Sequence, residues 1–486
     1  MTGPAVGTAA EGTIGFAKAL AVTEPGPIPG LLVVDLPVHG DNRGWFKENW
    51  QREKMLATGL PDFGPVQNNV SFNATTGTTR GIHAEPWDKY VSVATGRIFG
   101  AWVDLREGPG FGAVFTAELD PSRAVFVPRG VGNAFQTLED ATAYSYLVND
   151  HWSADAQAEY TFLNLADETA AIPWPIPLDR AELSAKDRAH PRLADVVPMP
   201  PRKTLVLGAN GQLGRALRAA YDGDASVAFA TRAELDLADA AAVAGFDWRG
   251  YGTVINAAAH TAVDAAETVA GRRDAWAANV TGVAALARAC LEHRLALVHV
   301  SSDYVFDGQD LDGEGRGEDA PMAPLGVYGQ TKAAADAIVS VLPRHYILRT
   351  SWVVGEGGNF VDTMASLAER GIAPSVVNDQ TGRLTFTRDL ADGIRHLLAS
   401  GAPYGTYNLT NAGEPMSWAQ IAAEVYAVTG HDPAAVTGVS TEEYFAGKQA
   451  APRPANSVLD LAKIRSTGFE PEDHLVRLRE YLNAST

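Results

Sequence analysis

The chain has 486 residues, of which 46% are hydrophobic and 20% charged, and its formal net charge is −19. This length exceeds one ordinary domain and predicts two or three. The acidic charge argues against a nucleic-acid partner, which would need a basic face, and no apolar run approaches the roughly 18 residues of a membrane span. The only cysteine, Cys290, cannot form an internal disulfide and lies in a helical pattern that predicts a buried, inert thiol. We therefore expect a cytoplasmic protein with neither a nucleic-acid nor a membrane partner.

The first part of the chain has the signals of short strands. Residues 1–23 lack a basic segment and a long apolar stretch, so we expect a flexible leader there. From 24 to 196, β-prone runs are separated by Gly, Pro, Asn and Asp. The clearest runs are 31–34, 91–93, 98–105 and 124–127. This spacing predicts an all-β, cupin-like jelly-roll barrel, followed by a proline-rich linker at 197–203.

A different texture begins at residue 204 and continues to residue 486. Apolar strands alternate with alanine-rich helical stretches. The expected strands cover 204–207, 253–256, 297–301 and 346–348. Such alternation is typical of a parallel sheet covered by helices, so the second domain is predicted to be an α/β, Rossmann-type doubly wound parallel sheet.

Three glycines follow the first strand of this domain and open a helix. Glycine lets the backbone turn tightly and approach a diphosphate at a helix N-terminus. The spacing is GxxGxxG, and a tight turn without a ligand is the alternative reading of the triplet alone. Small residues that end a later strand would also let a cofactor pass close to the backbone. The predicted cofactor-binding residues here are Gly208, Asn210, Gly211, Gln212, Leu213, Gly214, Ala257, Ala258 and Ala259.

The choice of cofactor depends on the end of the second strand. No acid stands there to bind a ribose, and Arg232 could instead meet a 2′-phosphate. A solvated surface arginine explains the same residue equally well. We expect NADPH, with NADH as the alternative, and place Arg232, Asp236 and Leu237 beside the cofactor.

Three further residues predict a reductase site. Ser302 stands at the end of a strand, where open α/β sheets place their ligands. Tyr328 and Lys332 are four residues apart, which puts them on one face of a helix. A neighbouring lysine lowers the pKa of a tyrosine and makes it a usable acid near neutral pH. The pair alone is common by chance, but the glycine turn and the strand-end serine strengthen it.

The region 204–481 resembles the dTDP-4-dehydrorhamnose reductases, which are extended short-chain dehydrogenases. The resemblance rests on GANGQLG, NAAAHTAVDAAE, SSDYVFDG, YGQTK, RTSWVVGEGGNF and RPANSVLD. It implies that Ser302, Tyr328 and Lys332 form a catalytic triad, the last two also touching the cofactor. Hydride would pass from the nicotinamide to a 4-keto carbon while Tyr328 protonates the oxygen. The resemblance also places three residues near the sugar nucleotide: Trp352, Asn359 and Arg453.

Polar side chains in the barrel domain predict a second pocket. Gln67, Asn69 and Ser71 alternate, so on a strand they share one face, either toward the barrel interior or toward solvent. Arg80 and His83 would face opposite ways on a regular strand, and the glycine between them, at position 81, predicts a bulge that re-aims one of them.

We expect no metal at this second pocket. A metal-binding cupin would have two further histidines, and only His83 is present. A metal-free His together with Lys89 suits proton abstraction next to a ketone, because the cation steadies the enolate oxygen. A single histidine taken alone is more often structural.

Residues from about 30 to 196 resemble the dTDP-4-dehydrorhamnose 3,5-epimerases, through DNRGWFKENW, VQNNVS, TRGIHAEP, VFVPRGVGNAF and LSAKD. The resemblance implies a His83–Asp187 dyad as base, Lys89 on the enolate and Tyr146 as proton donor on the opposite face. Asn133 stands where the family usually has histidine, which leaves open whether one or two carbons are inverted. The residues implied on the nucleotide side are Arg43, Phe46, Glu48, Gln67, Asn69 and Arg80.

The two resemblances name successive steps on one metabolite. They imply a bifunctional enzyme that epimerises dTDP-4-dehydro-6-deoxy-glucose at carbons 3 and 5 and reduces its 4-keto group with NAD(P)H to dTDP-L-rhamnose. The resemblance also implies a homodimer through the barrel. Two alternatives stay open: a single-carbon epimerase plus ketoreductase of another dTDP-deoxysugar route, and a non-catalytic regulator that binds a sugar nucleotide.

Overall fold

The computed structural model describes residues 16, 18–153, 156–309 and 315–484. The chain forms two compact units, Met1–Pro201 and Arg202–Thr486, so the boundary lies within the predicted linker at 197–203. Of the expected leader, 1–15 and 17 lie outside the described residues, and its end forms a strand, Ala21–Thr23. The barrel therefore begins slightly before the predicted residue 24. Among the described residues, no helix has the length and apolar character needed to cross a membrane.

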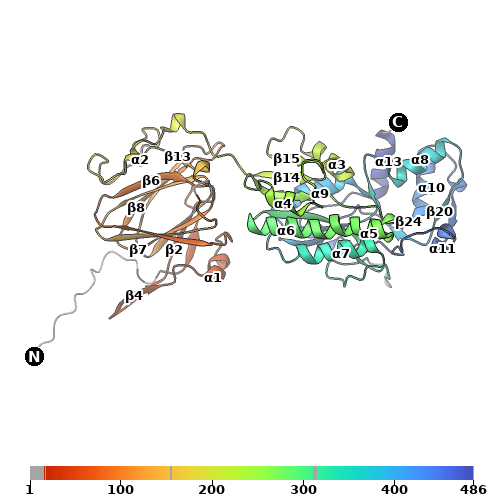
Figure 1. Ribbon diagram of the computed structural model, residues 1–486, viewed down its shortest axis with the longest axis horizontal. Helices are drawn as coiled ribbons and strands as arrows, with labels where there is room; N and C mark the ends of the chain where they lie inside the picture. Colours follow the sequence, from red (N-terminus) through yellow and green to blue (C-terminus); the bar gives the residue numbers. More distant parts are fainter. Residues whose placement is uncertain (1–15, 17, 154–155, 310–314, 485–486) are drawn as a thin grey trace, which may run out of the picture. The chain divides into compact units, whose positions relative to one another are not determined.

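The first unit consists of two antiparallel sheets that face each other (Figure 1). Their strand orders are β1-β2-β10-β7-β12-β5 and β13-β6-β11-β8-β9, which confirms the predicted jelly-roll barrel. The strands are β1 (Ala21–Thr23), β2 (Leu32–Asp35), β5 (Gln67–Asn73), β6 (Thr79–Ala84), β7 (Lys89–Thr95), β8 (Ile98–Asp104), β9 (Val114–Leu119), β10 (Arg123–Val127), β11 (Val131–Thr137), β12 (Thr142–Val148) and β13 (Thr161–Phe162). A separate hairpin is formed by β3 (Val38–Asp41) and β4 (Gly44–Lys47), and the helices are α1 (Arg52–Ala57) and α2 (Ala185–Arg188).

Successive side chains on a strand point to opposite sides, so a barrel strand can contribute to the core between the sheets and to a second core on its outer face. Trp102 and Val125 pack between the two sheets. The outer face of the six-stranded sheet, with Phe126, is covered by α1 and the loop after it. On the five-stranded sheet, Ile82 packs under the segment 163–199. That segment also carries α2, so this packing brings a late part of the chain onto β6.

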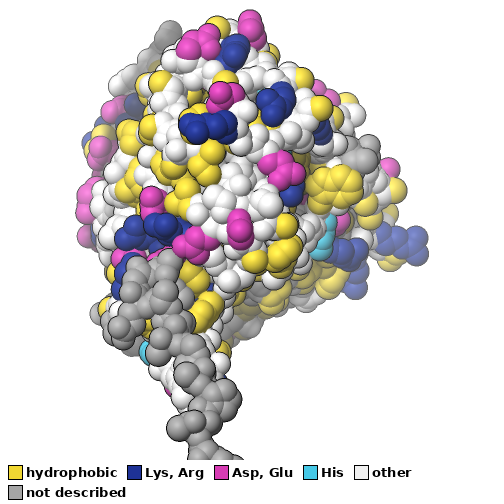
Figure 2. Space-filling view, turned by 90° about the vertical axis from the view of Figure 1, so that its left-hand side faces the viewer, with side chains coloured by type: hydrophobic (Ala, Val, Ile, Leu, Met, Phe, Trp, Pro, Cys, Tyr) yellow, Lys and Arg dark blue, Asp and Glu magenta, His cyan; other side chains and the backbone are white. Residues whose placement is uncertain are grey.

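Figure 2 shows one face of the barrel unit, on which basic and acidic side chains are intermixed with apolar ones. Such a surface differs from the single basic face that nucleic-acid binding uses. The expected lack of a nucleic-acid partner stays a prediction.

The second unit is built on a six-stranded parallel sheet of order β15-β14-β16-β17-β18-β23 (Figure 1). Its strands are β14 (Lys203–Leu207), β15 (Val227–Ala230), β16 (Tyr251–Asn256), β17 (Ala296–Ser302), β18 (His345–Thr350) and β23 (Gly405–Asn408). Its main helices are α3 (Gln212–Ala220), α4 (Ala240–Gly245), α5 (Val269–Trp276), α6 (Gly282–Glu292), α7 (Val327–Val339) and α9 (Thr387–Ser400).

Helices cover both faces of this sheet. Leu205 and Leu207 of β14 join the core formed with α4, α6 and α7. Val206, between them, joins the core formed with α3 and α9. This arrangement confirms the predicted doubly wound parallel sheet. Strand order reverses between β14 and β16, and such a switch point opens a crevice at the carboxyl ends of the strands.

A smaller lobe is formed by segments that lie before and after β23 in sequence. Its core is formed by α8 (Phe360–Glu369), α10 (Trp418–Val428) and α13 (His474–Ala484). The remaining short elements include β19 (Val353–Val354), β20 (Ser375–Val377), β21 (Thr381–Gly382), β22 (Thr385–Phe386), β24 (Met416–Ser417), β25 (Thr437–Val439), α11 (Thr441–Phe445) and α12 (Ala462–Ser466).

Candidate functional sites

The glycine turn between β14 and α3 has no room for side chains. Gly208 has φ +76°, and a Cβ there would lie 2.7 Å from the backbone nitrogen of Ala258. A Cβ at Gly214 would lie 2.2 Å from the carbonyl oxygen of Gly208. The N-cap of α3, Gly211, makes no side-chain capping hydrogen bond, so the first N–H groups of the helix have no such partner. The turn is a cradle in which the backbone itself can meet an anion.

Two cavities of about 670 and 580 Å³ adjoin this turn and share its residues. The shared lining is formed by Asn210, Gly211, Ala257, Ala258, Ala259 and Thr261. Both volumes lie in the range of small-molecule sites. The turn residues Gln212 and Leu213 line the second cavity, and Gly214 is buried against the turn behind it.

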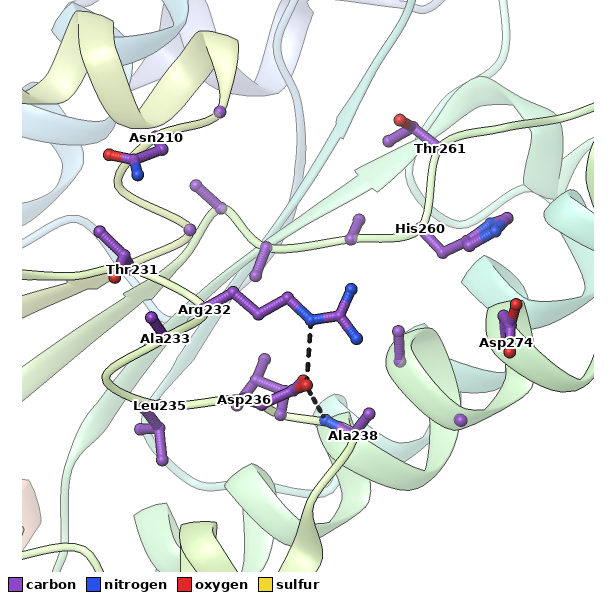
Figure 3. Close-up of a pocket in the computed structure, with 18 of the residues that line it drawn as sticks. Asn210, Thr231, Arg232, Ala233, Leu235, Asp236, Ala238, His260, Thr261 and Asp274 are labelled. Carbon is purple, nitrogen blue, oxygen red and sulfur yellow. Dashed lines mark hydrogen bonds and ion pairs between the residues drawn. The ribbon is translucent and has the colours of Figure 1, made fainter. Parts of the chain in front are cut away.

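Arg232, Asp236 and Leu237, which are predicted to lie beside the cofactor, all line the first cavity. Figure 3 shows the Arg232 side chain extending into this cavity, with its Nε donating to Asp236 Oδ2 at 2.9 Å. The arginine side chain is 83% exposed, so its guanidinium has donors available for an anion. Asp236 also accepts from the backbone N–H of Ala238, which fixes the carboxylate that holds the arginine. Thr231 and His260, which line the same cavity, were not predicted.

The predicted triad lines the second cavity. Ser302 ends β17, and Tyr328 and Lys332 lie one turn apart on α7, as the spacing predicted. The Lys332 Nζ donates to the carbonyl of Val300 at 2.6 Å. The three side chains therefore meet at the carboxyl edge of the sheet, where the switch point opens.

Burial controls the acidity of these groups. Burial raises the pKa of Tyr328 to about 12, with the charge of Asp303 adding to the increase and a hydrogen bond with Ser302 opposing it. The expectation that Lys332 lowers the tyrosine pKa is therefore wrong in this environment. Burial also lowers the pKa of Lys332 to about 8, which the negative charge of Asp336 partly opposes. Tyr328 thus holds its proton at neutral pH and can act as a proton donor.

Asp303 is a site residue that the sequence reasoning missed, although it follows Ser302 directly. Ser302 Oγ donates to Asp303 Oδ1 at 2.9 Å, and Asp303 Oδ2 is buried with no hydrogen-bond partner. Burial raises the pKa of this carboxyl to about 6. Its position in the SSDY stretch, directly after the predicted catalytic serine, could have identified it as a site residue.

Of the three residues expected near the sugar nucleotide, one lines the second cavity and two do not. Trp352 lines the second cavity, and its ring stacks on Trp418 at 3.7 Å. Asn359 instead caps α8 by accepting from the backbone N–H of Asp362. Arg453 forms an ion pair with Asp264, in which Nη2 of the arginine donates to both carboxylate oxygens at 2.9 Å. Neither Asn359 nor Arg453 lines this cavity.

In the barrel, a bulge brings Arg80 and His83 to the same cavity. On β11, Asn133 pairs with His83 and Phe135 pairs with Arg80, so β6 carries one extra residue between these two pairs. This finding confirms the bulge predicted at Gly81. A Cβ at Gly81 would lie 2.5 Å from the Cβ of the facing alanine, so the close approach requires glycine. The cavity has a volume of about 190 Å³.

His83 is paired with Asp187, which reaches it from α2. His83 Nε2 lies 3.1 Å from Asp187 Oδ1. Ser184 caps α2 by accepting from the backbone N–H of Asp187. Burial raises the pKa of Asp187, but the hydrogen bond and charge of His83 and the contact with Ser184 outweigh it, and the pKa falls below its usual value. The carboxylate is thereby kept ionised beside the imidazole.

The opposite sheet supplies the other two predicted groups. Lys89 on β7 and Tyr146 on β12 line the same cavity as His83, and the lysine Nζ lies 5.6 Å from the tyrosine ring centre. Lys89 Nζ also forms a buried ion pair with Glu85 at 2.6 Å, and Glu85 accepts a hydrogen bond from the indole of Trp87. Burial raises the pKa of Tyr146, and the charge of Glu85 adds to it. Glu85 was not predicted, because an acid four residues before a lysine is common on surfaces.

Other predicted barrel residues surround these groups. An adjoining cavity of about 250 Å³ is lined by Gln67 and Asn69, so the alternating face of β5 points inward. Asn133 accepts a hydrogen bond from the hydroxyl of Tyr144 at 3.2 Å. Three residues predicted on the nucleotide side line neither cavity, and they lie on or just after the hairpin β3–β4: Arg43, Phe46 and Glu48.

Comparison with known proteins gives a family for each half. The family model for the RmlD substrate binding domain matches residues 202–486, and that for dTDP-4-dehydrorhamnose 3,5-epimerase matches 25–195. The chain belongs to both families, as a fusion of an epimerase domain and a reductase domain. The reductase half is 40% identical to a dTDP-4-dehydrorhamnose reductase of Streptomyces griseus over 57% of this chain and 91% of that protein.

Two further relatives bear on the two sites. The epimerase half is 54% identical to an RmlC homologue of Streptococcus pyogenes, over 38% of this chain and 96% of that protein. A dTDP-4-dehydrorhamnose reductase of Bacillus anthracis, solved in complex with NADP, is 32% identical with a TM-score of 0.54, covering 59% of this chain and all of that one. Both relatives are matched over nearly their whole length, so each half of the fusion is a full family domain.

Proposed function

We propose that the chain catalyses two consecutive steps. The barrel epimerises dTDP-4-dehydro-6-deoxy-glucose at carbons 3 and 5, and the second domain reduces the 4-keto group with NADPH to give dTDP-L-rhamnose. One observation carries this proposal: each unit brings a complete set of acid, base or charge-stabilising groups to one cavity, His83 with Lys89 and Tyr146 in one and Ser302 with Tyr328 and Lys332 in the other. A non-catalytic regulator would not need either set.

The barrel geometry suits inversion at carbons beside a ketone. Asp187 holds the Nε2 of His83, so Nδ1 is the ring nitrogen left to take a proton from the substrate. The Lys89 ammonium can stabilise the negative oxygen of the resulting enolate. Tyr146 comes from the opposite sheet and keeps its proton, so it can return a proton to the other face of the sugar ring. A base on one side and an acid on the other is what inversion requires.

The reductase site fits a dinucleotide, because the turn at Gly208 and Gly214 has space only for backbone and the exposed Arg232 lines the far end of the crevice. Such a cofactor supplies the hydride for the 4-keto carbon. If its hydroxyl turns from Asp303 to the substrate, Ser302 can donate to the ketone oxygen, and Tyr328 can deliver the proton that this oxygen gains. Lys332 places a positive charge behind the tyrosine on the same helix face.

Arg232 supports NADPH over NADH. Its guanidinium is exposed in the cavity and can pair with a 2′-phosphate, which NADH lacks. Arg232→Ala should raise the KM for NADPH and leave that for NADH nearly unchanged. A steady-state preference of the unmodified protein for NADH would contradict this assignment.

We further infer that the protein is cytoplasmic and forms a homodimer through its barrel. Strand β5 lies at the edge of the six-stranded sheet and exposes Val70 and Phe72, with exposed fractions of 66% and 63%. Such an edge is a ready template for another chain. Arg43 and Phe46, which line neither described barrel cavity, are also exposed and could serve a neighbouring copy. Sedimentation of the full chain and of Phe72→Lys tests this: the variant should be monomeric, whereas an unmodified monomer would exclude the dimer.

The deciding experiment follows dTDP-4-dehydro-6-deoxy-glucose and NADPH in heavy water, by cofactor absorbance and product NMR. Deuterium at carbons 3 and 5 together with a dTDP-L-rhamnose product is expected. Deuterium at one carbon would favour the single-carbon route and make Asn133, held by Tyr144, the residue to test. Folded protein with neither exchange nor oxidation would favour the regulator.

A further inference from the structure

The dyad of the barrel lies within a cluster of three metal-ligating side chains. His83, Asp187 and His190 each offer one ligand atom, and these atoms all lie within 4.8 Å of one another. Asp187 Oδ1 is 3.1 Å from His83 Nε2 and 4.0 Å from His190 Nε2. The sequence expectation of no metal considered only the cupin pattern around His83, whereas this cluster draws two members from the segment that packs over β6.

His190 is the unusual member of the cluster. Its side chain is only 7% exposed, and no hydrogen bond of 3.5 Å or less reaches either ring nitrogen; the ring has only longer polar contacts, with Asp187 and with the backbone of Leu163. Its ring stacks on Phe162 at 4.7 Å and meets His83 edge-on at 5.3 Å, so packing holds it beside the dyad. Buried polar groups nearly always have a partner, and an unpaired one calls for an explanation such as a bound ion.

We propose that this cluster is a site for a divalent transition-metal ion of the zinc type, and that metal binding switches off the epimerase. Two imidazoles and a carboxylate form a ligand set that Zn²⁺ favours. Bonds of about 2.0–2.2 Å in a tetrahedral arrangement place ligand atoms about 3.4 Å apart. The distances of 3.1 and 4.0 Å to Asp187 lie on either side of that separation, so small side-chain movements complete the site.

The effect on catalysis follows from the imidazole tautomer and rests on the proposed function of His83. A neutral imidazole carries one proton. While Nε2–H donates to Asp187, Nδ1 has the lone pair that accepts the substrate proton. A metal bound to Nε2 requires a lone pair on that nitrogen, so the ring proton moves from Nε2 to Nδ1. Nδ1 then no longer has a free lone pair to accept the substrate proton. The imidazole stays neutral throughout, but it can no longer act as a base.

The test uses the full chain after chelator treatment, with Zn²⁺ as the probe. Binding is measured by calorimetry. Epimerase activity is followed as deuterium uptake from heavy water without NADPH, and reductase activity as NADPH oxidation with substrate epimerised beforehand. We expect one bound Zn²⁺ per chain, at least a tenfold fall in deuterium uptake, an unchanged reductase rate, and recovery on adding chelator.

His190→Phe preserves the stack on Phe162 but removes a ligand, and should weaken zinc binding by at least about tenfold. Deuterium uptake by this variant without zinc reports whether its barrel is folded. If the barrel is not folded, His190→Gln replaces it in the binding test. His293→Gln, outside the cluster, is the matched control and should bind zinc as the unmodified protein does.

Three results would overturn the inference: no zinc binding by the unmodified chain, deuterium uptake that continues with zinc bound, or equal loss of both activities. A chain that takes up no deuterium even without zinc would instead refute the proposed epimerase, and the calorimetry would still decide the metal site.

Discussion

The two domains assemble their catalytic groups over very different sequence distances. In the reductase domain, Ser302 ends a strand and Tyr328 and Lys332 share one helix face, so local spacing already places them together. In the barrel, His83 meets an aspartate 104 residues later, and Tyr146 comes from the other sheet. An α/β site can therefore be predicted from periodicity, while a barrel site depends on which late segment packs over which strand.

The two domains also treat buried charge differently. The barrel neutralises its lysine directly, through the ion pair between Lys89 and Glu85. The reductase domain also holds a buried ion pair, Arg349 with Asp336, but two of its site residues carry strong shifts: burial lowers the pKa of Lys332 to about 8 and raises that of Asp303 to about 6. Strongly shifted groups of this kind are typical of active sites. Each domain should therefore respond differently to the loss of one charged side chain.

The largest expected effect is on the reductase alone. Tyr328→Phe removes the proton donor and should lower the rate of NADPH oxidation by about 10²–10⁴-fold. Deuterium uptake by the barrel should stay unchanged, because the two sites share no residue. Measuring both activities on one preparation provides the control. A variant that keeps full reductase activity would remove Tyr328 from the mechanism.

The reciprocal change affects the barrel. His83→Asn keeps a polar group beside Asp187 but removes the base, and should lower deuterium uptake by about 10²–10³-fold. NADPH oxidation with substrate that has already been epimerised should continue at the unmodified rate. Solvent exchange that persists in this variant would show that another group takes the proton.

Much of this architecture could be predicted from the sequence. Apolar strands with alternating helices gave the doubly wound sheet, and the odd spacing of Arg80 and His83 gave the bulge on β6. The wrong predictions concern the environment of a side chain rather than its place. Lys332 was expected to acidify Tyr328, but burial dominates at that position. Spacing along a chain carries no information on how deeply a group is buried.

Residues that the sequence reasoning missed depend on long-range packing. Glu85 becomes a site residue because Lys89 is buried against it, and His190 because α2 and the segment after it fold over β6. Asn359 is the reverse case: its family stretch predicts a substrate contact, which stays a prediction, while in the structure its side-chain oxygen caps α8. Motifs locate a region, and only the fold assigns each side chain within it.

The next effect tests the buried ion pair. Lys89→Met leaves Glu85 as an uncompensated buried charge and should lower the free energy of unfolding of the barrel by about 3–5 kcal/mol. The double variant Lys89→Met/Glu85→Gln removes both charges while keeping an oxygen for the indole of Trp87. It should recover most of that stability without recovering deuterium uptake. Equal destabilisation of the single and double variants, measured by chemical denaturation, would contradict a charge-based cost.

The smallest effect concerns the stability of the reductase domain. The folded-state pKa of Asp303, about 6, lies above the usual 3.8, so protonation favours the folded state. Protonated Asp303 contributes fully to the free energy of unfolding below pH ~4, and this contribution is lost as the pH rises through about 6. The free energy of unfolding differs by about 3 kcal/mol between the two ends of this range. Asp303→Asn removes this dependence, because its amide stays neutral. The variant should therefore be about 3 kcal/mol more stable than the unmodified protein at pH 7.5 and only about 1 kcal/mol more stable at pH 4.5.

Thermal inactivation of NADPH oxidation, followed at both pH values, isolates the domain in which Asp303 lies. Asp319→Asn, at an exposed position, is the matched control and should change stability at neither pH. If Asp303→Asn gained stability equally at both pH values, the gain would come from packing rather than from charge. If it gained stability at pH 7.5 and lost reductase activity, the buried carboxylate would be a group kept for catalysis at the expense of the fold.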